Sequence, residues 1–522
     1  MRISKLLPSW NTRHFCTSIS TTNLNYTINC YILDRNVYNA RKLFDQNPST
    51  RNVVSWNSMI SGYVKNNQMA QAQQLFDEMP ERDIVSWNTM LSGFHKAGNP
   101  EKVYILFSEM VRVGLRPTEF TFSTVVRALI STRLSVLITQ LHGHIICSAF
   151  NLDFYVGSAL MRAYTDVRDA EGMRRVFDEI SLKEASVWNG LILGFMDIGQ
   201  INESQRAFDM MPVRNVVSWT ILVNGYINNG RLDEARLKFD MMTEKNVFSW
   251  TAMIKGYVQY GNFLYAFELF VSMLRLGPYP NQFTLSSVLE ACAGSSSLML
   301  GNQVHSCILK SGIPCDVILL TSLVDMYAKC GDIEAAHCIF ESMPKKNVAS
   351  WNSIIGGYAR HGIATRALQE FERMKNVGVK PDKITFINVL SACGHGGLVE
   401  EGEGQFADME MKYGIQAEKE HYACMVDLFG KAGQLEKAEK LIKEMPFKPD
   451  VVIWGALIGA CGLYSRLELG EFAAKELSSL EQDHPAVYIM LSRIHNDKDV
   501  WDSVKRSKKQ KACSWVDSSC TR

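Results

Sequence analysis

The sequence predicts an all-α fold, an α-solenoid of helix-turn-helix repeats, and two observations indicate it. Segments of one pattern return along the chain: VVSWNSMISGY begins at Val53, IVSWNTMLSGF at Ile84 and VASWNSIIGGY at Val348. Self-similarity with a period of about 20–50 residues is typical of solenoid proteins. Within each copy, apolar residues also keep the spacing of a helix face, and glycine or proline usually follows a helical segment.

Each repeat is predicted to contain two helices. In the copy that begins at Val53, apolar residues of the first segment have the spacing i, i+3, i+4 and i+7, which is one face of a helix. They are Trp56, Met59, Ile60 and Tyr63. After a polar break the spacing returns at Ala72, Leu75, Phe76 and Met79. Tryptophan recurs at the fourth place of the repeats, which predicts that it packs between neighbouring repeats. These tryptophans are Trp56, Trp87, Trp188, Trp219, Trp250, Trp351 and Trp454.

Glycine and proline mark the two turns of each repeat. Glycine at the fifteenth place predicts a left-handed residue that closes the first helix. It occurs as Gly98, Gly199, Gly230, Gly261, Gly331, Gly362, Gly397 and Gly433. Proline follows the second helix, as at Pro80, Pro212 and Pro344, and predicts that this helix ends there.

Each repeat is counted so that its Ser-Trp pair, or the equivalent residues, stands at the third and fourth places. This numbering sets the boundaries of the repeats. The repeats are 21–52, 53–83, 84–118, 119–153, 154–184, 185–215, 216–246, 247–281, 282–316, 317–347, 348–382, 383–418 and 419–450. We therefore predict an array of about 13 repeats over residues 21–450, each 31–36 residues long. Tetratricopeptide repeats keep a period of about 34 residues with another aromatic pattern, so these lengths argue against them.

Composition narrows the function classes. The net charge of +1 among 522 residues excludes a generic polycation, and no apolar run reaches the roughly 18 residues of a membrane span. Near the amino terminus the chain carries Arg2, Lys5 and Arg13, with no acidic residue before Asp34. This pattern predicts an organelle transit peptide in residues 1–20, with a disordered amino terminus as the alternative.

The repeats resemble a known family. VVSWNSMISGY, ARLKFDMM and GVKPD are similar to the pentatricopeptide repeat (PPR) family of plant organelles. The mixture of 31-, 35- and 36-residue repeats resembles the PLS subclass, in which standard, long and short repeats alternate. The resemblance implies a right-handed superhelix whose concave face binds single-stranded RNA, one base per repeat.

Two places of each repeat are expected to select the base. The fifth place is small, usually polar and variable, and the last place alternates mainly between Asn and Asp. An Asp carboxylate can accept the imino hydrogen of uracil or guanine, whereas an Asn amide can donate to the ring nitrogen of adenine or cytosine. The expected RNA-binding residues are Asn25, Asn52, Asn57, Asp83, Asn88, Thr118, Ser123, Asp153, Asn189, Asn215, Thr220, Asn246, Thr251, Asn281, Ser286, Asp316, Thr321, Asn347, Asn352 and Asp382. The alternative is that these residues merely cap helices.

Within the family, Asn at the fifth place goes with pyrimidines, and Ser or Thr goes with purines. The pairs Asn57 with Asp83 and Asn352 with Asp382 are thus expected to read U, and Thr321 with Asn347 to read A. Carried along the array, the resemblance implies the target 5′-YUYNNYAANAUNN-3′. The long repeats at 119–153 and 282–316 would favour G by their residues, but they are left as N because the family code is unreliable in such repeats.

The carboxyl-terminal residues 451–522 resemble a shortened E-type extension of RNA-editing factors. In that group the array selects a cytidine, and a deaminase converts it to uridine. A zinc deaminase needs H-x-E and C-x-x-C, and neither occurs among the 11 histidines and 13 cysteines. We therefore expect no enzyme activity, catalytic residue, metal or cofactor in this chain. The expected partners are single-stranded organellar RNA, a deaminase-bearing PPR protein and multiple organellar RNA editing factor proteins, with no membrane.

Three functions remain open. The first is recognition of a C-to-U editing site in an organellar transcript, and the second is RNA binding for stability, splicing or translation without editing. The third is a protein-binding helical scaffold. The early arginines favour the mitochondrion over the chloroplast.

Overall fold

The computed structural model describes residues 20–130, 135–147, 154–464, 466–481 and 487. The described chain is helical, as predicted, and it divides into two halves, residues 1–244 and 245–522. The predicted transit peptide, apart from Ser20, and most of the segment after 481 lie outside the described residues. Among the described residues, no helix is both long and apolar enough to cross a lipid bilayer.

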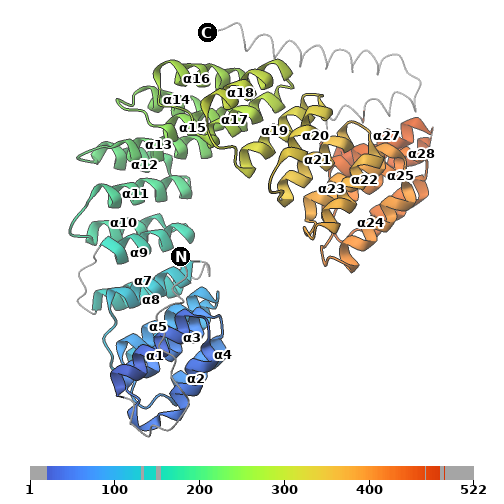
Figure 1. Cartoon of the computed structure of the whole chain (residues 1–522). Helices are drawn as coiled ribbons and strands as arrows, with labels where there is room; N and C mark the ends of the chain where they lie inside the picture. The colour runs from blue at the N-terminus through green and yellow to red at the C-terminus, as the bar shows by residue number, and fades with distance from the viewer. Residues whose placement is uncertain (1–19, 131–134, 148–153, 465, 482–486, 488–522) are drawn as a thin grey trace. The chain divides into compact units, whose positions relative to one another are not determined.

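The N-terminal half pairs its helices into hairpins that correspond to the predicted repeats (Figure 1). Its elements are α1 (Thr21–Leu33), α2 (Val37–Gln46), the short 3₁₀ helix η1 (Pro48–Thr50), α3 (Val53–Lys65), α4 (Met69–Glu78), α5 (Ile84–Lys96), α6 (Pro100–Arg112), α7 (Glu119–Leu129), α8 (Ser135–Cys147), α9 (Phe154–Asp166), α10 (Ala170–Glu179), α11 (Ala185–Ile198), α12 (Ile201–Met210), α13 (Val216–Asn228) and α14 (Leu232–Asp240).

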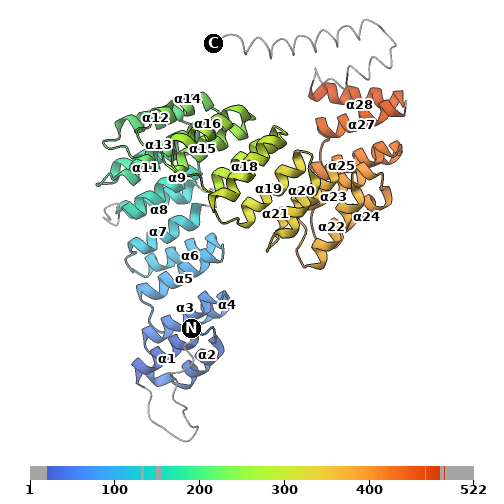
Figure 2. The same cartoon turned by 45° about the horizontal axis from the view of Figure 1, so that its top comes forward.

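The C-terminal half repeats the same arrangement (Figure 2). Its helices are α15 (Val247–Gln259), α16 (Phe263–Leu276), α17 (Gln282–Gly294), α18 (Leu298–Ser311), α19 (Val317–Lys329), α20 (Ile333–Ser342), α21 (Val348–Arg360), α22 (Ala364–Asn376), α23 (Lys383–Gly396), α24 (Val399–Met411), α25 (Lys419–Lys431), α26 (Leu435–Glu444), α27 (Val451–Leu463) and α28 (Leu467–Leu480). Each first helix contacts both its own partner and the first helix of the next repeat, as α21 contacts α22 and α23. The first helices therefore form a continuous layer within the half.

The turn between the two helices confirms the glycine prediction. All eight glycines at the fifteenth place have positive φ, from 67° at Gly397 to 96° at Gly331. Where another residue takes this place within the described chain, the backbone is the same, since Arg35, Asn67, Arg168 and Ser296 also have positive φ. The hairpin geometry is thus set by the packing of the two helices, and glycine adopts it with the least strain.

A repeated aromatic pair joins several repeats to the repeat before them. The fourth-place tryptophan packs edge-on against a phenylalanine of the preceding second helix, for example Trp351 on Phe340 with ring centroids 4.8 Å apart. The other pairs of this kind are Phe44 with Trp56, Phe76 with Trp87, Phe177 with Trp188 and Phe208 with Trp219. A basic side chain also lies over the phenylalanine ring, as Lys346 does at 4.9 Å from the Phe340 ring centre. The packing role predicted for these tryptophans is confirmed.

The hairpin of α27 and α28 packs directly against α25 and shares its core. Trp454 and Leu457 of α27 are buried in one cluster with Met425 and Phe429 of α25. The boundary at 450, taken from the resemblance to an E-type extension, therefore does not interrupt the stacking of hairpins, and the extension itself stays a prediction.

Candidate nucleic-acid interface

The last place of each repeat lies at the amino-terminal end of the next repeat's first helix. Asp382, for example, precedes α23, and its Oδ1 accepts the backbone N–H of Thr385 at 2.9 Å. The predicted residues that cap in this way are Asn52, Asp83, Thr118, Asn215, Asn246, Asn281, Asp316, Asn347 and Asp382. The last place therefore does cap the next helix, and whether it also reads a base stays a prediction. Asp153 lies outside the described residues.

Capping also fixes which atoms the last place offers to a ligand. In Asn347 the side-chain oxygen accepts the N–H of Ser350 at 2.9 Å, and only an oxygen can accept from that donor. The amide NH₂ of Asn347 must then point away from the helix. A capping Asn consequently offers a hydrogen-bond donor, whereas a capping Asp offers its second carboxylate oxygen as an acceptor. The cap and a base-reading contact can use different atoms of one side chain.

Four of the predicted pairs of fifth and last places are joined by hydrogen bonds. Asn57 Nδ2 donates to Asp83 Oδ1 at 3.0 Å, and Asn352 Nδ2 donates to Asp382 Oδ1 at 2.9 Å. The bonds from Asn25 to Asn52 and from Asn88 to Thr118 are longer, at 3.3 and 3.4 Å. The tertiary structure therefore brings together residues that are 26–30 positions apart in the sequence.

The fifth places with Ser or Thr are arranged differently. The hydroxyls of Thr220 and Thr321 donate to carbonyls of their own helices, at Val216 and Val317. Ser123 likewise donates to Phe120, and Thr251 lies 2.7 Å from the Thr284 hydroxyl. Within the described residues, no direct hydrogen bond joins the fifth place to the last place in the repeats of Thr220, Thr251 and Thr321, and the last place of the Ser123 repeat lies outside those residues.

Three predicted residues, Asn57, Asn189 and Ser286, have a side-chain oxygen that lacks a partner within the described chain. Asn189 is 9% exposed, and its Oδ1 accepts no hydrogen bond. The Ser286 hydroxyl is also buried without a partner. The pair of Asn189 and Asn215 is thus not joined in the way that Asn352 and Asp382 are.

The paired aspartates are held as carboxylates. Burial by itself would raise the pKa of Asp382, but hydrogen bonds from Asn352 and Thr385 outweigh it, and the net pKa lies below its ordinary value. Asp83 has a lowered pKa for the same reasons, with Asn57 and Ser86 as donors. Asn352 is only 7% exposed, whereas Asp382 is more exposed, so the carboxylate is the group that a base can reach.

A third residue, missed by the sequence reasoning, completes these pairs. It is the Ser or Thr at the third place of the following repeat, directly before the tryptophan or its equivalent. Members that are completely buried are Ser55, Ser86, Thr121, Ser218, Ser249, Thr284, Ser350 and Thr385. Several return a hydrogen bond to the capping residue, as Thr385 Oγ1 accepts the N–H of Asp382 at 3.1 Å. Its regular occurrence in the Ser-Trp pair was the available signal, because a capping box has this spacing.

The second place was also missed, and it forms an exposed apolar row beside the pairs. Within each half, most repeats carry a large apolar residue there with about half or more of its surface exposed. They are Val54, Val85, Phe120, Tyr155, Val217, Phe248, Phe283, Ile318, Ile384 and Val452. Single exposed apolar residues need no explanation, but exposure at the same place of nearly every repeat does.

One hollow of the N-terminal half joins these features. Its volume is about 350 Å³, and its lining includes Val85 and Phe120 from the second places of consecutive repeats. Asn88, a predicted RNA-binding residue, lines the same hollow, together with Lys65 and Lys96. Apolar walls, an amide and two ammonium groups suit a flat base with a phosphate beside it.

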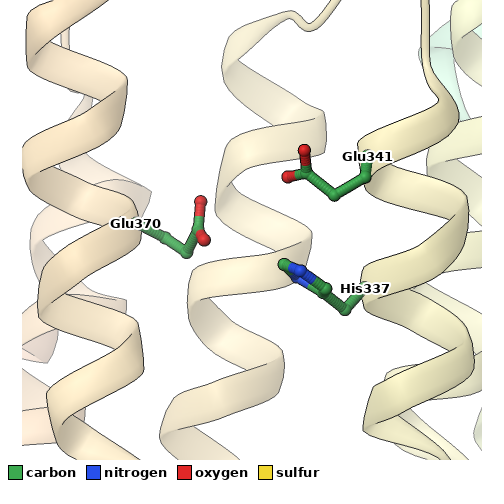
Figure 3. Close-up of side chains that lie close together, drawn as sticks. All are labelled: His337, Glu341 and Glu370. Atoms are coloured by element: carbon green, nitrogen blue, oxygen red, sulfur yellow. The ribbon is translucent and has the colours of Figure 1, made fainter.

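Three side chains of the C-terminal half could be taken for a metal site. His337 and Glu341 of α20 and Glu370 of α22 point toward one another, with potential ligand atoms within 4.8 Å (Figure 3). Arg373, however, binds both oxygens of Glu341, at 2.5 and 2.9 Å, and lowers its pKa. We therefore interpret this cluster as an ion pair between neighbouring repeats and assign no metal to it.

The fold and this interface define a helical-repeat protein, and comparisons with known proteins identify the family. The PPR repeat family matches residues 51–84, 82–131, 245–294 and 346–395, and the PPR repeat pattern matches 217–247, 318–348 and 420–448. The chain belongs to the pentatricopeptide repeat family.

Similar proteins include two from Arabidopsis thaliana. Pentatricopeptide repeat-containing protein At2g03880, mitochondrial, is 36% identical over 88% of this chain, and At1g77170, mitochondrial, is 42% identical over 77%. This chain spans 64% of the first relative and 73% of the second. Both relatives are named for their repeats and not for an enzymatic activity.

Among solved structures, PPR10 in complex with an 18-nt psaJ RNA element has the same fold. The TM-score is 0.59 at 16% sequence identity, over 94% of this chain and 85% of PPR10. The predicted α-solenoid is thereby confirmed.

Proposed function

We propose that this protein binds single-stranded RNA in a sequence-specific manner, with one base read by each paired fifth and last place. The observation that carries the proposal is the pair Asn352 and Asp382. Its capping and pairing bonds all end on Asp382 Oδ1, which leaves Oδ2 as an acceptor. Uracil offers an imino hydrogen to that acceptor, whereas cytosine has a bare ring nitrogen there. The pair thus favours U over C.

The capping asparagines favour the opposite set of bases. In Asn52, Asn246, Asn281 and Asn347 the side-chain oxygen accepts a backbone N–H at 2.9 Å. The remaining NH₂ can donate to the ring nitrogen of cytosine or adenine. The exposed second-place residues would stack on the bases, which is a contact that every base tolerates. PPR10, whose fold this chain has, was crystallised with RNA, and this supports the proposal.

The proposed biological role is site recognition for C-to-U editing of an organellar transcript, as a PLS-subclass, E-type protein. The order of repeat lengths and the tail after 450 support this role by resemblance. The proposed partners are a deaminase-bearing PPR protein and multiple organellar RNA editing factor proteins, as the resemblance to E-type factors implies. The mitochondrial names of the relatives support a mitochondrial location, with the chloroplast as the alternative.

A titration of the purified chain with 5′-YUYNNYAANAUNN-3′ tests RNA recognition. The matched control RNA has U at the three A positions. We expect tighter binding to the first RNA, because Asn246, Asn281 and Asn347 face the A positions as donors. Equal binding to both RNAs would contradict base reading, and absence of binding would favour a protein-binding scaffold.

The editing role needs a separate experiment. Organellar transcripts from plants with and without this protein are sequenced for C-to-U changes near matching target sites. Loss of editing at one cytidine just downstream of a match would support the role. Intact editing together with a lost or misprocessed transcript would favour RNA binding without editing.

A further inference from the structure

The third-place hydroxyl reaches across the repeat boundary to the fifth place of the preceding repeat. Thr385 Oγ1 lies 2.6 Å from Asn352 Oδ1, and both groups are buried. The same contact recurs at Ser55 with Asn25, at 2.6 Å, and at Thr121 with Asn88, at 2.7 Å. Three repeats in the two halves thus share one arrangement.

The direction of the hydrogen bonds follows from the donors available. Thr385 Oγ1 already accepts the N–H of Asp382, so its single hydrogen is available for an acceptor. Asn352 Oδ1 is that acceptor at 2.6 Å, with Asp382 Oδ1 at 2.8 Å as the competitor. The Asn352 amide must then turn its NH₂ toward Asp382, where it donates at 2.9 Å.

The opposite orientation of the amide would disturb the reading carboxylate. A flipped Asn352 would place its carbonyl oxygen against Asp382 Oδ1, and two acceptors would repel each other. Its NH₂ would face a hydroxyl that already accepts the Asp382 N–H. The carboxylate would lose one of its donors and be held by Thr385 alone, which fixes its reading position less firmly.

Two Asn repeats lack this contact, those of Asn57 and Asn189, and near Asn189 the hydroxyl of Ser218 donates to Asn215 instead. Ser86, which follows the repeat of Asn57, donates to Asp83 instead, and Asn57 Oδ1 is buried without a partner among the described residues. The pair of Asn57 and Asp83 keeps its own hydrogen bond at 3.0 Å without a donor from the third place.

We propose that the third-place Ser or Thr is a positioning residue for base selection by the preceding repeat, since its hydroxyl orients the fifth-place Asn amide. The inference rests on the proposed RNA binding. It makes the reading group a set of three residues, two from one repeat and one from the next.

The test measures base preference in the full chain with the RNA given above, in which repeat 348–382 reads the eleventh nucleotide. We expect Thr385→Val to lower the preference for U over C at that nucleotide about fivefold, as loss of one hydrogen bond predicts. Thr385→Ser should restore it, because the hydroxyl returns. Preference for A at the tenth nucleotide should not change.

Ser350→Ala is the matched control. Ser350 also accepts a capping bond, from Asn347 N at 3.0 Å, but the preceding fifth place, Thr321, donates to its own helix at Val317. We expect this variant to lose stability and to keep its preference for A at the tenth nucleotide. A purely structural role of the third place predicts instead that both variants behave alike.

A second variant guards against misfolding of the first. Thr121→Val removes the same contact to Asn88 in the N-terminal half and should lower the preference for a pyrimidine at the third nucleotide. Unchanged preference in the folded Thr385→Val or Thr121→Val variant would overturn the inference. If the unsubstituted chain has no base preference, the proposed function fails and the inference fails with it.

Discussion

Two neighbouring repeats, 317–347 and 348–382, have the same backbone but use it differently. Both close their first helix with a left-handed glycine, Gly331 and Gly362. The next helix is capped in both cases at 2.9 Å, by Asn347 and by Asp382. At the fifth place of the first repeat, the Thr321 hydroxyl donates to a carbonyl of its own helix. At the fifth place of the second repeat, the Asn352 amide donates to the last-place Asp382.

The difference teaches that the scaffold and the reading residues vary independently. Turning Thr321 inward leaves Asn347 as the polar group offered by its repeat. Turning Asn352 toward Asp382 makes a bonded pair whose charge is stabilised. Because the caps and turns are common to both repeats, a change of base preference need not cost the array its stability.

The largest loss of stability is expected when a side chain that packs one repeat against the preceding repeat is truncated. Trp351 is 1% exposed and packs on Phe340, while the corresponding residue of repeat 317–347 is the half-buried Leu320. We expect Trp351→Ala to destabilise the protein by about 3–5 kcal/mol and Leu320→Ala by less than about 2 kcal/mol. Urea denaturation followed by circular dichroism measures both. Equal losses of stability in the two variants would mean that the aromatic pair is not the main contact between repeats.

Replacing the last-place Asp of repeat 348–382 by Asn should change the base that this repeat prefers. Asp382→Asn keeps an oxygen for the cap of α23 but offers NH₂ in place of an acceptor, so C should replace U at the eleventh nucleotide. A change of about 1–3 kcal/mol is expected, by analogy with paired base contacts on DNA. Competition binding with RNAs that differ at this nucleotide measures it. Asp382→Glu is the control that keeps the charge, and unchanged preference in Asp382→Asn would contradict the assignment.

The shared turn should respond equally in both repeats. Gly331→Ala and Gly362→Ala each place a Cβ at positive φ, and open space surrounds both positions. The cost is therefore conformational, about 1–2 kcal/mol for each substitution. Thermal unfolding of the two variants should give matching shifts. A marked difference would mean that the two turns are not equivalent.

A substitution at the fifteenth place of the preceding repeat, 282–316, should increase the stability of the protein. Ser296 has φ of 50° where its neighbours have glycine. Ser296→Gly should stabilise the protein by about 0.5–1 kcal/mol, because relief of strain exceeds the entropy that glycine loses on folding. The same thermal unfolding measures the gain, with Gly331→Ala as the control of opposite sign. A loss of stability would indicate that the Ser296 side chain contributes contacts.

The smallest effect is expected from pH. The lowered pKa of Asp382 means that its favourable contribution is present above the unfolded pKa of about 3.9 and is lost as pH falls through the folded value. Preference for U at the eleventh nucleotide should thus stay constant from pH 8 to pH 5. Titrations at three pH values measure it. A decline with a midpoint above pH 5 would show that the carboxylate is not held as the structure indicates.

Much of the fold was predictable because its signals are local. The helical spacing around Trp56, the glycine at places such as Gly331 and the proline after most second helices all act over a few residues. Variation at the fifth and last places also pointed to Asn352 and Asp382, which the structure joins. The capping role of the last place was weighed as an alternative to reading, although one side chain can do both.

The sequence by itself determined the repeat, its two helices, its turns and the places that vary, since these are set by the order of residues along each helix. The tertiary structure alone decided that Thr385 meets Asn352 across 33 residues and that Thr321 turns inward. It also decided that second-place residues such as Val85 stay exposed beside the pairs. These outcomes depend on how adjacent first helices pack, and no spacing within one repeat specifies that contact.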